Sequence, residues 1–103
     1  MGAYKIVFAP HADRDLDRIV RYVRRDNPEA AERLGQRLID RAVSLTEQGT
    51  AQMGSVIRKR PGVRRLVEGN YLIYYRIFPE QDKVRILRFW HAAQSPRRLR
   101  TNV

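Results

Sequence analysis

Apolar residues in the first half of the chain recur at the spacing of amphipathic helices. Between Pro10 and about Asp26 they return every three or four positions, at Ala12, Leu16, Ile19, Val20 and Val23. A second stretch runs from Pro28 to about Gln48, with apolar residues at Ala31, Leu34, Leu38, Ala42 and Leu45. Asn27 and Pro28 separate the two stretches, because a residue before proline avoids the helical region while Asn is a good helix cap. We therefore predict a hairpin of two helices, the second ending at Gly49.

Four other stretches have the residue types of β-strands. They are rich in β-branched and aromatic residues and are bounded by turn formers: Tyr4–Ala9, Val63–Val67, Tyr71–Phe78 and Val84–His91. Tyr71–Phe78 is apolar rather than alternating, which predicts a central strand covered on both faces. The side chains of Val84–His91 should alternate between two faces. One face is then Val84, Ile86, Arg88 and Trp90, and the other is Arg85, Leu87, Phe89 and His91.

The segments between these elements carry turn residues or charge. We predict a loop at Gly49–Ser55, and at Val56–Pro61 either an irregular basic arm or an edge strand that ends at the proline. Glu68–Asn70 should form a hairpin turn, since Gly and Asn tolerate positive φ. Pro79–Lys83 should turn the chain before the last strand. The end of the chain offers little to pack, so residues 96–103 are expected to form a flexible tail.

The order of predicted elements is β-α-α-β-β-β. A length of 103 residues suits one domain with a single core, so residues 1–103 are interpreted as one domain. Two helices alone cannot bury their joint apolar stripe, which therefore needs the sheet as its partner. We predict an α+β fold in which a helical hairpin packs on a mostly antiparallel sheet.

The charge of the chain is high and unevenly distributed. The formal net charge is +10, and 18 of the 21 basic residues are Arg. Residues 1–50 carry nine Lys/Arg against eight Asp/Glu (net +1), whereas residues 51–103 carry twelve against three (net +9). Such a field attracts nucleic acid or an acidic protein partner. The alternative is an arginine-rich composition that merely covers a solvated surface, but this would raise both halves alike.

Several kinds of chemistry are excluded or disfavoured by composition. Without Cys the chain has no disulfide framework and no thiol nucleophile. Two His without any Cys supply too few of the usual ligands for a zinc site, so no metal or cofactor is expected. Glycines are scattered at turns and form no phosphate loop. The longest apolar run, Tyr71–Tyr75, is far below the roughly 20 residues of a spanning helix. The N-terminal residues do not resemble a secretion signal, so we expect a soluble cytoplasmic protein without membrane contact.

What remains is a constellation of basic residues with one histidine. Its members are Arg58, Lys59, Arg60, Arg64, Arg65, Arg76, Arg85, Arg88 and His91. Arg65, Arg76 and Arg88 are expected to align across three adjacent strands. Guanidinium groups bind phosphates bidentately and stabilise charge that develops on them, and a histidine can exchange a proton near neutral pH. This set is compatible with metal-independent RNA cleavage through the 2′-hydroxyl, but a second acid–base partner is missing. The alternative is that the arginines lie over the sheet in solvent and His91 only ends a strand.

Four runs in the sequence are similar to the RelE/ParE superfamily of toxins from type II toxin–antitoxin systems. They are Asn27–Ala31 (NPEAA), Pro61–Val67 (PGVRRLV), Tyr71–Arg76 (YLIYYR) and Val84–His91 (VRILRFWH). The resemblance extends over residues 4–97, and its order of elements agrees with the predicted fold. It implies a toxin that is neutralised by a small acidic antitoxin, whose extended or helical segment wraps around it in a hetero-oligomer.

The resemblance implies two different targets. In the RelE branch the toxin cleaves ribosome-bound messenger RNA, and Arg65, Arg88 and His91 stand where its catalytic residues would be sought. However, that branch uses a C-terminal Tyr or a His-Tyr pair, and here Ala92 follows His91 and no Tyr follows Tyr75. The ParE branch inhibits DNA gyrase and has no known catalytic set. The runs opening at Asn27 and Pro61 look more like ParE, so we favour gyrase inhibition, with a plain nucleic-acid-binding domain as a third hypothesis. The expected target-binding residues are Arg58, Lys59, Arg60, Arg64, Arg65 and Arg76.

Overall fold

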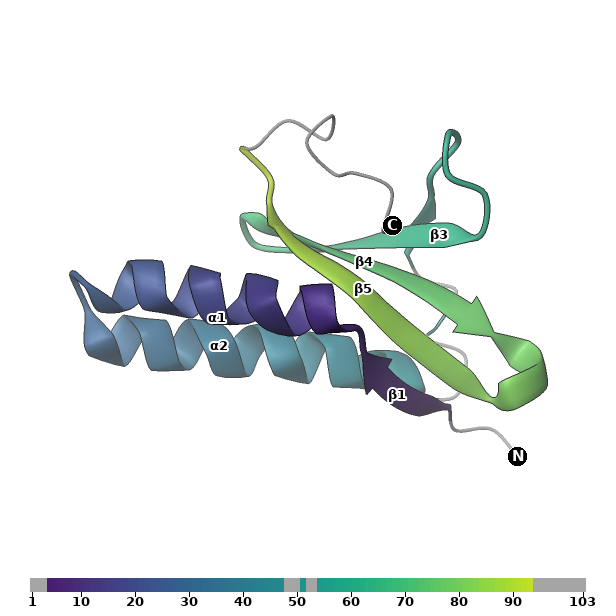
Figure 1. The fold of residues 1–103 in the computed structure, drawn as a ribbon, viewed down its shortest axis with the longest axis horizontal. Helices are drawn as coiled ribbons and strands as arrows, with labels where there is room; N and C mark the ends of the chain where they lie inside the picture. The colour runs from purple at the N-terminus through teal and green to yellow at the C-terminus, as the bar shows by residue number, and fades with distance from the viewer. Residues whose placement is uncertain (1–3, 48–50, 52–53, 94–103) are drawn as a thin grey trace.

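The computed structural model describes residues 4–47, 51 and 54–93. Two helices lie side by side and pack against a twisted sheet (Figure 1). The helices are α1 (Pro10–Arg24) and α2 (Pro28–Val43), followed by one 3-10 turn, η1 (Ser44–Thr46). The strands are β1 (Lys5–Phe8), β2 (Ser55–Val56), β3 (Val63–Glu68), β4 (Tyr71–Phe78) and β5 (Lys83–His91), with the 3-10 turn η3 (Pro79–Gln81) before β5. The predicted α+β fold is confirmed, while the predicted tail at 96–103 lies outside the described residues.

The five strands form one sheet in the order β1-β5-β4-β3-β2. β1 is parallel to β5, and the other neighbours are antiparallel, so the sheet is mostly antiparallel as predicted. Of the ambiguous segment Val56–Pro61, only Val56 belongs to a strand, at the edge of the sheet. The residues between β2 and β3 form a tight loop, in which the Arg60 N–H donates to Ile57 O (3.1 Å) and the Val63 N–H donates to Arg60 O (3.1 Å).

The helices begin where the sequence predicts. Pro10 and Pro28 each occupy the first turn, where a missing N–H costs no hydrogen bond, and the Asn27 side chain accepts a hydrogen bond from the Ala30 N–H (3.0 Å). The end of α2 was predicted too late, at Gly49. The α-helix ends at Val43, where the hydroxyls of Ser44 and Thr46 donate to main-chain carbonyls three residues back. Such bonds compete with the helical pattern and tighten the last turn.

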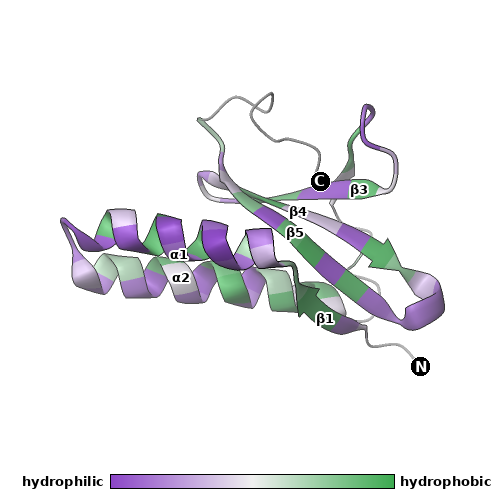
Figure 2. Ribbon diagram, in the orientation of Figure 1, coloured by the Kyte–Doolittle hydropathy of each residue, from purple (hydrophilic) through white to green (hydrophobic). Residues whose placement is uncertain are grey.

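The two faces of the sheet bury different clusters. We call the face covered by α1 and α2 the helix face and the opposite one the far face. Under the helices, Ile73 and Tyr75 of β4 pack with apolar residues of both helices, whereas Leu72 and Tyr74 belong to a smaller cluster on the far face. Figure 2 shows the corresponding stripes of apolar and polar residues along the helices. β4 is therefore a central strand buried on both faces, as predicted.

A β-bulge in β5 changes the predicted alternation of its side chains. Tyr74 pairs with Arg88 but Tyr75 pairs with Ile86, so Leu87 is an extra residue in β5. Beyond this point the faces exchange: Phe89 joins the helix-face cluster that contains Val84 and Ile86, while Leu87 and Trp90 join the far-face cluster. The predicted faces are correct as far as Leu87 and wrong from Arg88 onward, because one inserted residue shifts every later side chain.

An acidic residue at the end of β3, Glu68, links the sheet to α2. Glu68 forms ion pairs with two arginines of α2, Arg37 (Nε to Oε2, 3.2 Å) and Arg41 (Nε to Oε1, 3.4 Å). The opposite end of the hairpin, at the connection between α1 and α2, projects beyond the sheet (Figure 1), and Tyr22 there is 70% exposed.

Neither helix in the described part of the chain is long and apolar enough to cross a membrane.

Candidate functional site

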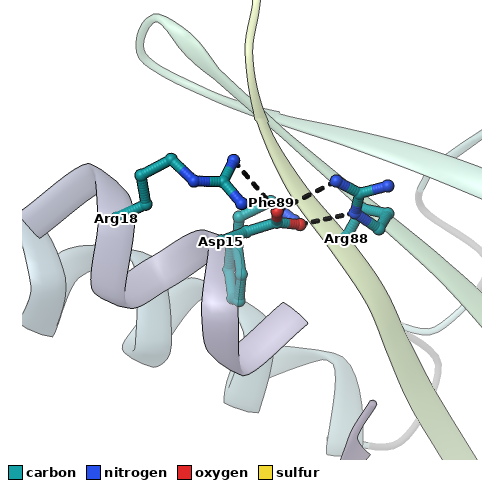
Figure 3. A network of polar contacts seen from close by, with 4 residues as sticks. All are labelled: Asp15, Arg18, Arg88 and Phe89. Atoms are coloured by element: carbon teal, nitrogen blue, oxygen red, sulfur yellow. Dashed lines mark hydrogen bonds and ion pairs between the residues drawn. The ribbon is translucent and has the colours of Figure 1, made fainter. Parts of the chain in front are cut away.

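A buried ion pair joins α1 to β5. Arg88 donates from Nε to Asp15 Oδ2 (2.6 Å) and from Nη2 to Asp15 Oδ1 (3.0 Å), and these side chains are only 9% and 2% exposed. Figure 3 shows the Asp15 carboxylate between Arg88 and Arg18, whose Nη1 is 3.7 Å from Oδ1. A buried charge is tolerated only when it is paired and hydrogen-bonded. The Arg88 guanidinium is therefore already neutralised within the fold.

The position of Asp15 follows from where β1 ends. The parallel pairing with β5 stops at Phe8, and the Ala9 N–H donates the next bond to Ile86 O (2.9 Å) before the chain turns into α1. Beyond that point no strand in the described part of the chain covers this edge of β5. At this edge the Asp15 carboxylate, rather than a neighbouring strand, accepts a hydrogen bond from the Phe89 N–H (3.1 Å). One acidic side chain thus satisfies both a buried guanidinium and an edge N–H.

Asp15 is a site residue that was not predicted from the sequence. The signal was present, because Asp15 lies three residues after Ala12 and four before Ile19, on the apolar stripe of α1 rather than on its charged side. Asp13 and Asp17, by contrast, are exposed, and Asp17 is bonded to Arg21 one turn later. That hydrogen bond lowers the pKa of the Asp17 carboxyl and raises the pKa of Arg21. An acid on the apolar stripe of a helix indicates one half of a buried ion pair.

His91 lies at the end of β5, against Tyr71 on β4. The two rings meet edge to face with their centroids 5.0 Å apart. The Ala93 N–H donates to His91 Nδ1 (3.0 Å), so any proton exchange by this histidine would use Nε2. Burial raises the pKa of Tyr71, against a smaller opposing effect of Arg37.

A pocket of about 340 Å³ opens beside these rings, between α1 and the end of β5. Its lining is formed by Asp15, Arg18, Ile19, Tyr22, Tyr71, Phe89, Trp90 and His91. Apolar and aromatic side chains dominate, and the cation Arg18 lies at its side. Three of its lining residues, Phe89, Trp90 and His91, belong to the part of β5 that no strand in the described residues covers on this side.

The structure does not bring Arg65, Arg88 and His91 together. Arg65 and Arg88 both stand opposite Tyr74, on the far face, as expected for neighbouring strands. His91 stands opposite Tyr71, which packs against the helix-face cluster, three positions along the sheet. Successive residues of a strand point to opposite faces, so His91 lies on the other side of the sheet from Arg65.

The predicted row of Arg65, Arg76 and Arg88 is only partly present. Arg76 pairs with Val63 and with Arg85 instead, which places it in the next far-face row. The predicted row assumed an unbroken register, and the bulge in β5 helps to break it.

The six residues expected to bind a target are divided among three places. Arg58, Lys59 and Arg60 lie in the loop between β2 and β3, which we call the basic loop (Arg58–Gly62). Arg65 and Arg76 project from the far face. Arg64 lies on the helix side, where its Nη1 donates to Gly54 O (2.8 Å).

A family model describing the ParE toxin of the type II toxin–antitoxin system parDE matches residues 6–96. The chain belongs to this family. The toxin is also similar to solved structures. One is the toxin–antitoxin complex RelBE2 from Mycobacterium tuberculosis, with 28% identity over 91% of this chain and 97% of the other, and a TM-score of 0.69. Another is the chromosomal ParDE system of P. aeruginosa, with 22% identity, 86% and 96% coverage, and a TM-score of 0.73.

The fold extends to more distant members of the superfamily. The isolated RelE toxin of E. coli has 16% identity, with 94% and 93% of the two chains covered and a TM-score of 0.58. At this identity the likeness concerns the fold alone. No curated protein sequence matches the toxin closely enough to add to these comparisons. The comparisons therefore place the chain among type II toxins, with a fold shared by ParE and RelE proteins.

Metal-assisted chemistry has no evident site in the described ranges. No group of three or more His, Asp or Glu side chains within residues 4–47, 51 and 54–93 is arranged to hold a metal ion.

Proposed function

We propose that this toxin arrests growth by inhibiting DNA gyrase in the cytoplasm, without a catalytic step of its own, and that a small acidic antitoxin neutralises it. The observation that carries the proposal is the dispersal of the candidate catalytic groups. Arg88 is neutralised by Asp15, and Arg65 and His91 lie on opposite faces of the sheet. A binding toxin needs no such assembly, and the match to the ParE family model supports the same conclusion.

The basic loop and the two far-face arginines form the surface that we propose for the target. Arg58 and Lys59 are exposed, as is Arg65, so they are free to meet a partner without unfolding any element. Electrostatic attraction between such a surface and an acidic one raises the rate of encounter and falls steeply with salt. Arg64, bonded to Gly54 O on the helix side, is the weakest member of the predicted set.

We propose the pocket between α1 and β5 as the antitoxin's docking site. RelBE2 and ParDE are toxin–antitoxin systems, which supports a protein partner for this toxin as well. The pocket is lined mostly by apolar side chains, and an exposed apolar surface of this kind is typical of a protein interface. The net charge of +10 favours an acidic partner. If high salt alone separates the complex completely, charge rather than apolar burial holds it, and this docking site is wrong.

RNA cleavage is a second candidate function, and it is favoured by the similarity to the RelBE2 complex. The RelBE2 complex is the structural relative with 28% identity, and its toxin bears the RelE name. A ribosome-dependent messenger RNA endoribonuclease would use Arg65, Arg88 and His91 without a metal. For Arg88 to act on a phosphate, its bonds to Asp15 would first have to break.

Two assays with the isolated toxin distinguish these functions. Gyrase inhibition predicts loss of plasmid supercoiling by purified gyrase, weakened when Arg58, Lys59 and Arg60 are replaced by Gln. Replacing Arg14, Arg24 and Arg33 by Gln removes the same charge from exposed helical positions and should have little effect. Cleavage of messenger RNA on translating ribosomes, lost in His91→Ala, with supercoiling unaffected would overturn the gyrase proposal. Normal growth during verified expression without antitoxin would overturn both functions.

A further inference from the structure

The strands of the sheet carry far more positive than negative charge. β1, β3, β4 and β5 contain seven Lys or Arg residues but one acid, Glu68. The seven cations are Lys5, Arg64, Arg65, Arg76, Lys83, Arg85 and Arg88. A sheet that only had to fold would gain from cross-strand pairs of opposite charge. The imbalance is therefore not explained by the stability of the sheet.

In the described part of the chain, two of these seven cations have polar partners at 3.0 Å or less, whereas Lys83 lies over the Phe78 ring at 4.7 Å. Arg88 is paired with Asp15, and Arg64 donates to Gly54 O on the helix side. Glu68, the single acidic residue of these four strands, forms ion pairs with two arginines of α2 instead. Five cations remain, all on the far face, and we call them the cationic face: Lys5, Arg65, Arg76, Lys83 and Arg85. None of the five is in an ion pair with a carboxylate in the described part of the chain.

Four members of the cationic face form a compact block. Lys5 is the register partner of Lys83, and Arg76 is the register partner of Arg85. Side chains directly opposite each other on neighbouring strands are about 5 Å apart at Cβ, and like charges there are destabilising. Lys83 and Arg85 lie two positions apart on β5, which is about 7 Å. The fold thus holds two repelling pairs side by side where one acidic residue would have relieved them.

The loop between β2 and β3 holds one corner of this block in place. Arg76 Nη1 donates to Pro61 O at 3.4 Å. The next residue, Gly62, has φ +84°, and a Cβ there would clash with the same nitrogen. The glycine therefore permits a left-handed turn and also leaves room for the guanidinium. Because of this contact the basic loop, with exposed Arg58 and Lys59, lies next to the block and extends it.

We propose that the cationic face binds the sugar–phosphate backbone of nucleic acid. A phosphodiester chain presents closely spaced negative charges and releases counterions when cations replace them, which makes adjacent, unpaired Lys and Arg residues effective binders. Guanidinium groups add bidentate hydrogen bonds to phosphate oxygens. The contacts reach the backbone rather than base edges, so the binding is independent of sequence. If the proposed function holds, the relevant nucleic acid is the duplex DNA on which gyrase acts.

The test measures fluorescence anisotropy of labelled duplex DNA and labelled single-stranded RNA of equal length, over a range of salt concentrations. The face variant is the double substitution Arg76→Gln with Arg85→Gln. Its control, Arg14→Gln with Arg33→Gln, removes the same charge from exposed positions on α1 and α2. The face variant should bind about tenfold more weakly at low salt, and its salt dependence should lose a slope of about two, one for each phosphate contact. The control should lose less than about threefold, as expected from net charge alone.

Each outcome decides the proposal. Preference for duplex DNA supports it with DNA as the source of the phosphates, and preference for RNA supports it with RNA as the source. Equal losses in the face and control variants would show that only net charge matters and would overturn it. Binding of polyglutamate but of neither nucleic acid would also overturn it and assign the face to an acidic protein. Thermal unfolding shows whether both variants are folded, and the face variant should melt no lower than wild type because it loses repelling charges.

The assay contains no gyrase, so it fails or succeeds independently of the proposed function. A toxin that binds DNA through this face but leaves supercoiling unaffected would disprove gyrase inhibition alone. A toxin that inhibits gyrase but binds neither probe would disprove the cationic face alone.

Discussion

On the helix face of the sheet, Glu68 is held by two arginines of α2, and at its edge Asp15 is held by Arg88. On the far face, Lys5 stands opposite Lys83 and Arg76 opposite Arg85 with no acid between them. The same sheet therefore balances charge where elements pack together and leaves it unbalanced where they do not. Charge within the packed side contributes to folding, whereas charge on the far face is a cost that a partner can offset. Substitutions on the two sides should consequently differ in sign.

The largest expected effect comes from Asp15→Ala. This substitution leaves the Arg88 guanidinium buried without its partner and also removes the acceptor of the Phe89 N–H. The free energy of unfolding should fall by about 3–5 kcal/mol, measured by chemical denaturation. Asp15→Leu combined with Arg88→Met should recover much of the loss, because apolar groups of similar size often replace a buried pair well. An Asp15→Ala toxin as stable as wild type would contradict the assignment of charge balance to the packed side.

Tyr75→Phe tests the helix side without removing a formal charge. The buried Tyr75 hydroxyl donates to Ala51 O (2.6 Å) and accepts from the Gly54 N–H (2.9 Å), so its loss leaves both groups unpaired. The free energy of unfolding should fall by about 1–3 kcal/mol. Tyr22→Phe, at a residue 70% exposed, is the matched control and should have almost no effect.

The same tyrosine predicts a pH dependence. Burial raises the pKa of Tyr75 above its usual value of 10.0, against smaller opposing effects of the Gly54 hydrogen bond and nearby arginines. A raised pKa means that the folded state favours the neutral phenol, so this contribution to stability is complete below pH 10.0 and is lost as pH rises through the folded-state pKa. Unfolding free energies measured on both sides of that range should decline more steeply in wild type than in Tyr75→Phe. Parallel curves would refute the role of burial.

Gly62→Ala and Gly69→Ala compare two left-handed turns, one beside the cationic face and one in the β3–β4 hairpin. Their φ angles are +84° and +59°, so each alanine should cost about 1–2 kcal/mol in the free energy of unfolding. Only the Gly62 Cβ would displace Arg76, whereas the Gly69 Cβ meets Arg37. Anisotropy titrations should therefore show weaker nucleic-acid binding for Gly62→Ala alone. Equal binding by both variants would mean that the loop does not position Arg76.

The smallest effects should have opposite signs on the two sides. Arg76→Gln relieves repulsion from Arg85 and should raise the free energy of unfolding by about 0.2–1 kcal/mol. Glu68→Gln weakens contacts with Arg37 and Arg41 and should lower it by up to about 1 kcal/mol, a modest value because the pairs are partly exposed to solvent. Denaturation curves that shift in the same direction for both variants would remove the contrast on which the cationic face depends.

Much of the fold could be predicted from local pattern. The two helices, their first residues Pro10 and Pro28, and the buried central strand Tyr71–Phe78 all follow from the spacing and type of neighbouring residues. The end of α2 did not follow, because hydroxyl groups of Ser44 and Thr46 tighten the last turn before Gly49 is reached. The bulge at Leu87 could not be predicted either, since one extra residue leaves no mark on composition or length.

The candidate site was less predictable because it depends on pairings across long separations. The parallel register that sets Lys5 beside Lys83 joins residues from the two ends of the chain, and no local pattern fixes it. Arg88 was expected to be a free cation because its partner, Asp15, lies 73 residues away in the sequence, and no residue near Arg88 indicates the pairing. The excess of charge in the second half did predict a cationic surface, but only the register shows which side of the sheet carries it.

The carboxylate of Asp15 has a consequence for self-association. An uncovered strand edge is a template on which a strand from another copy can add, and this is a common route to aggregation. Beyond Phe8 the edge of β5 is such a template, with aromatic residues on it. Asp15 already accepts the Phe89 N–H of this edge, so a strand that added here would have to displace a carboxylate that is also bonded to Arg88. A toxin lacking this side chain should therefore aggregate as well as unfold more readily. Helix α1 thus protects the edge of the sheet against strand addition, in addition to covering its helix face.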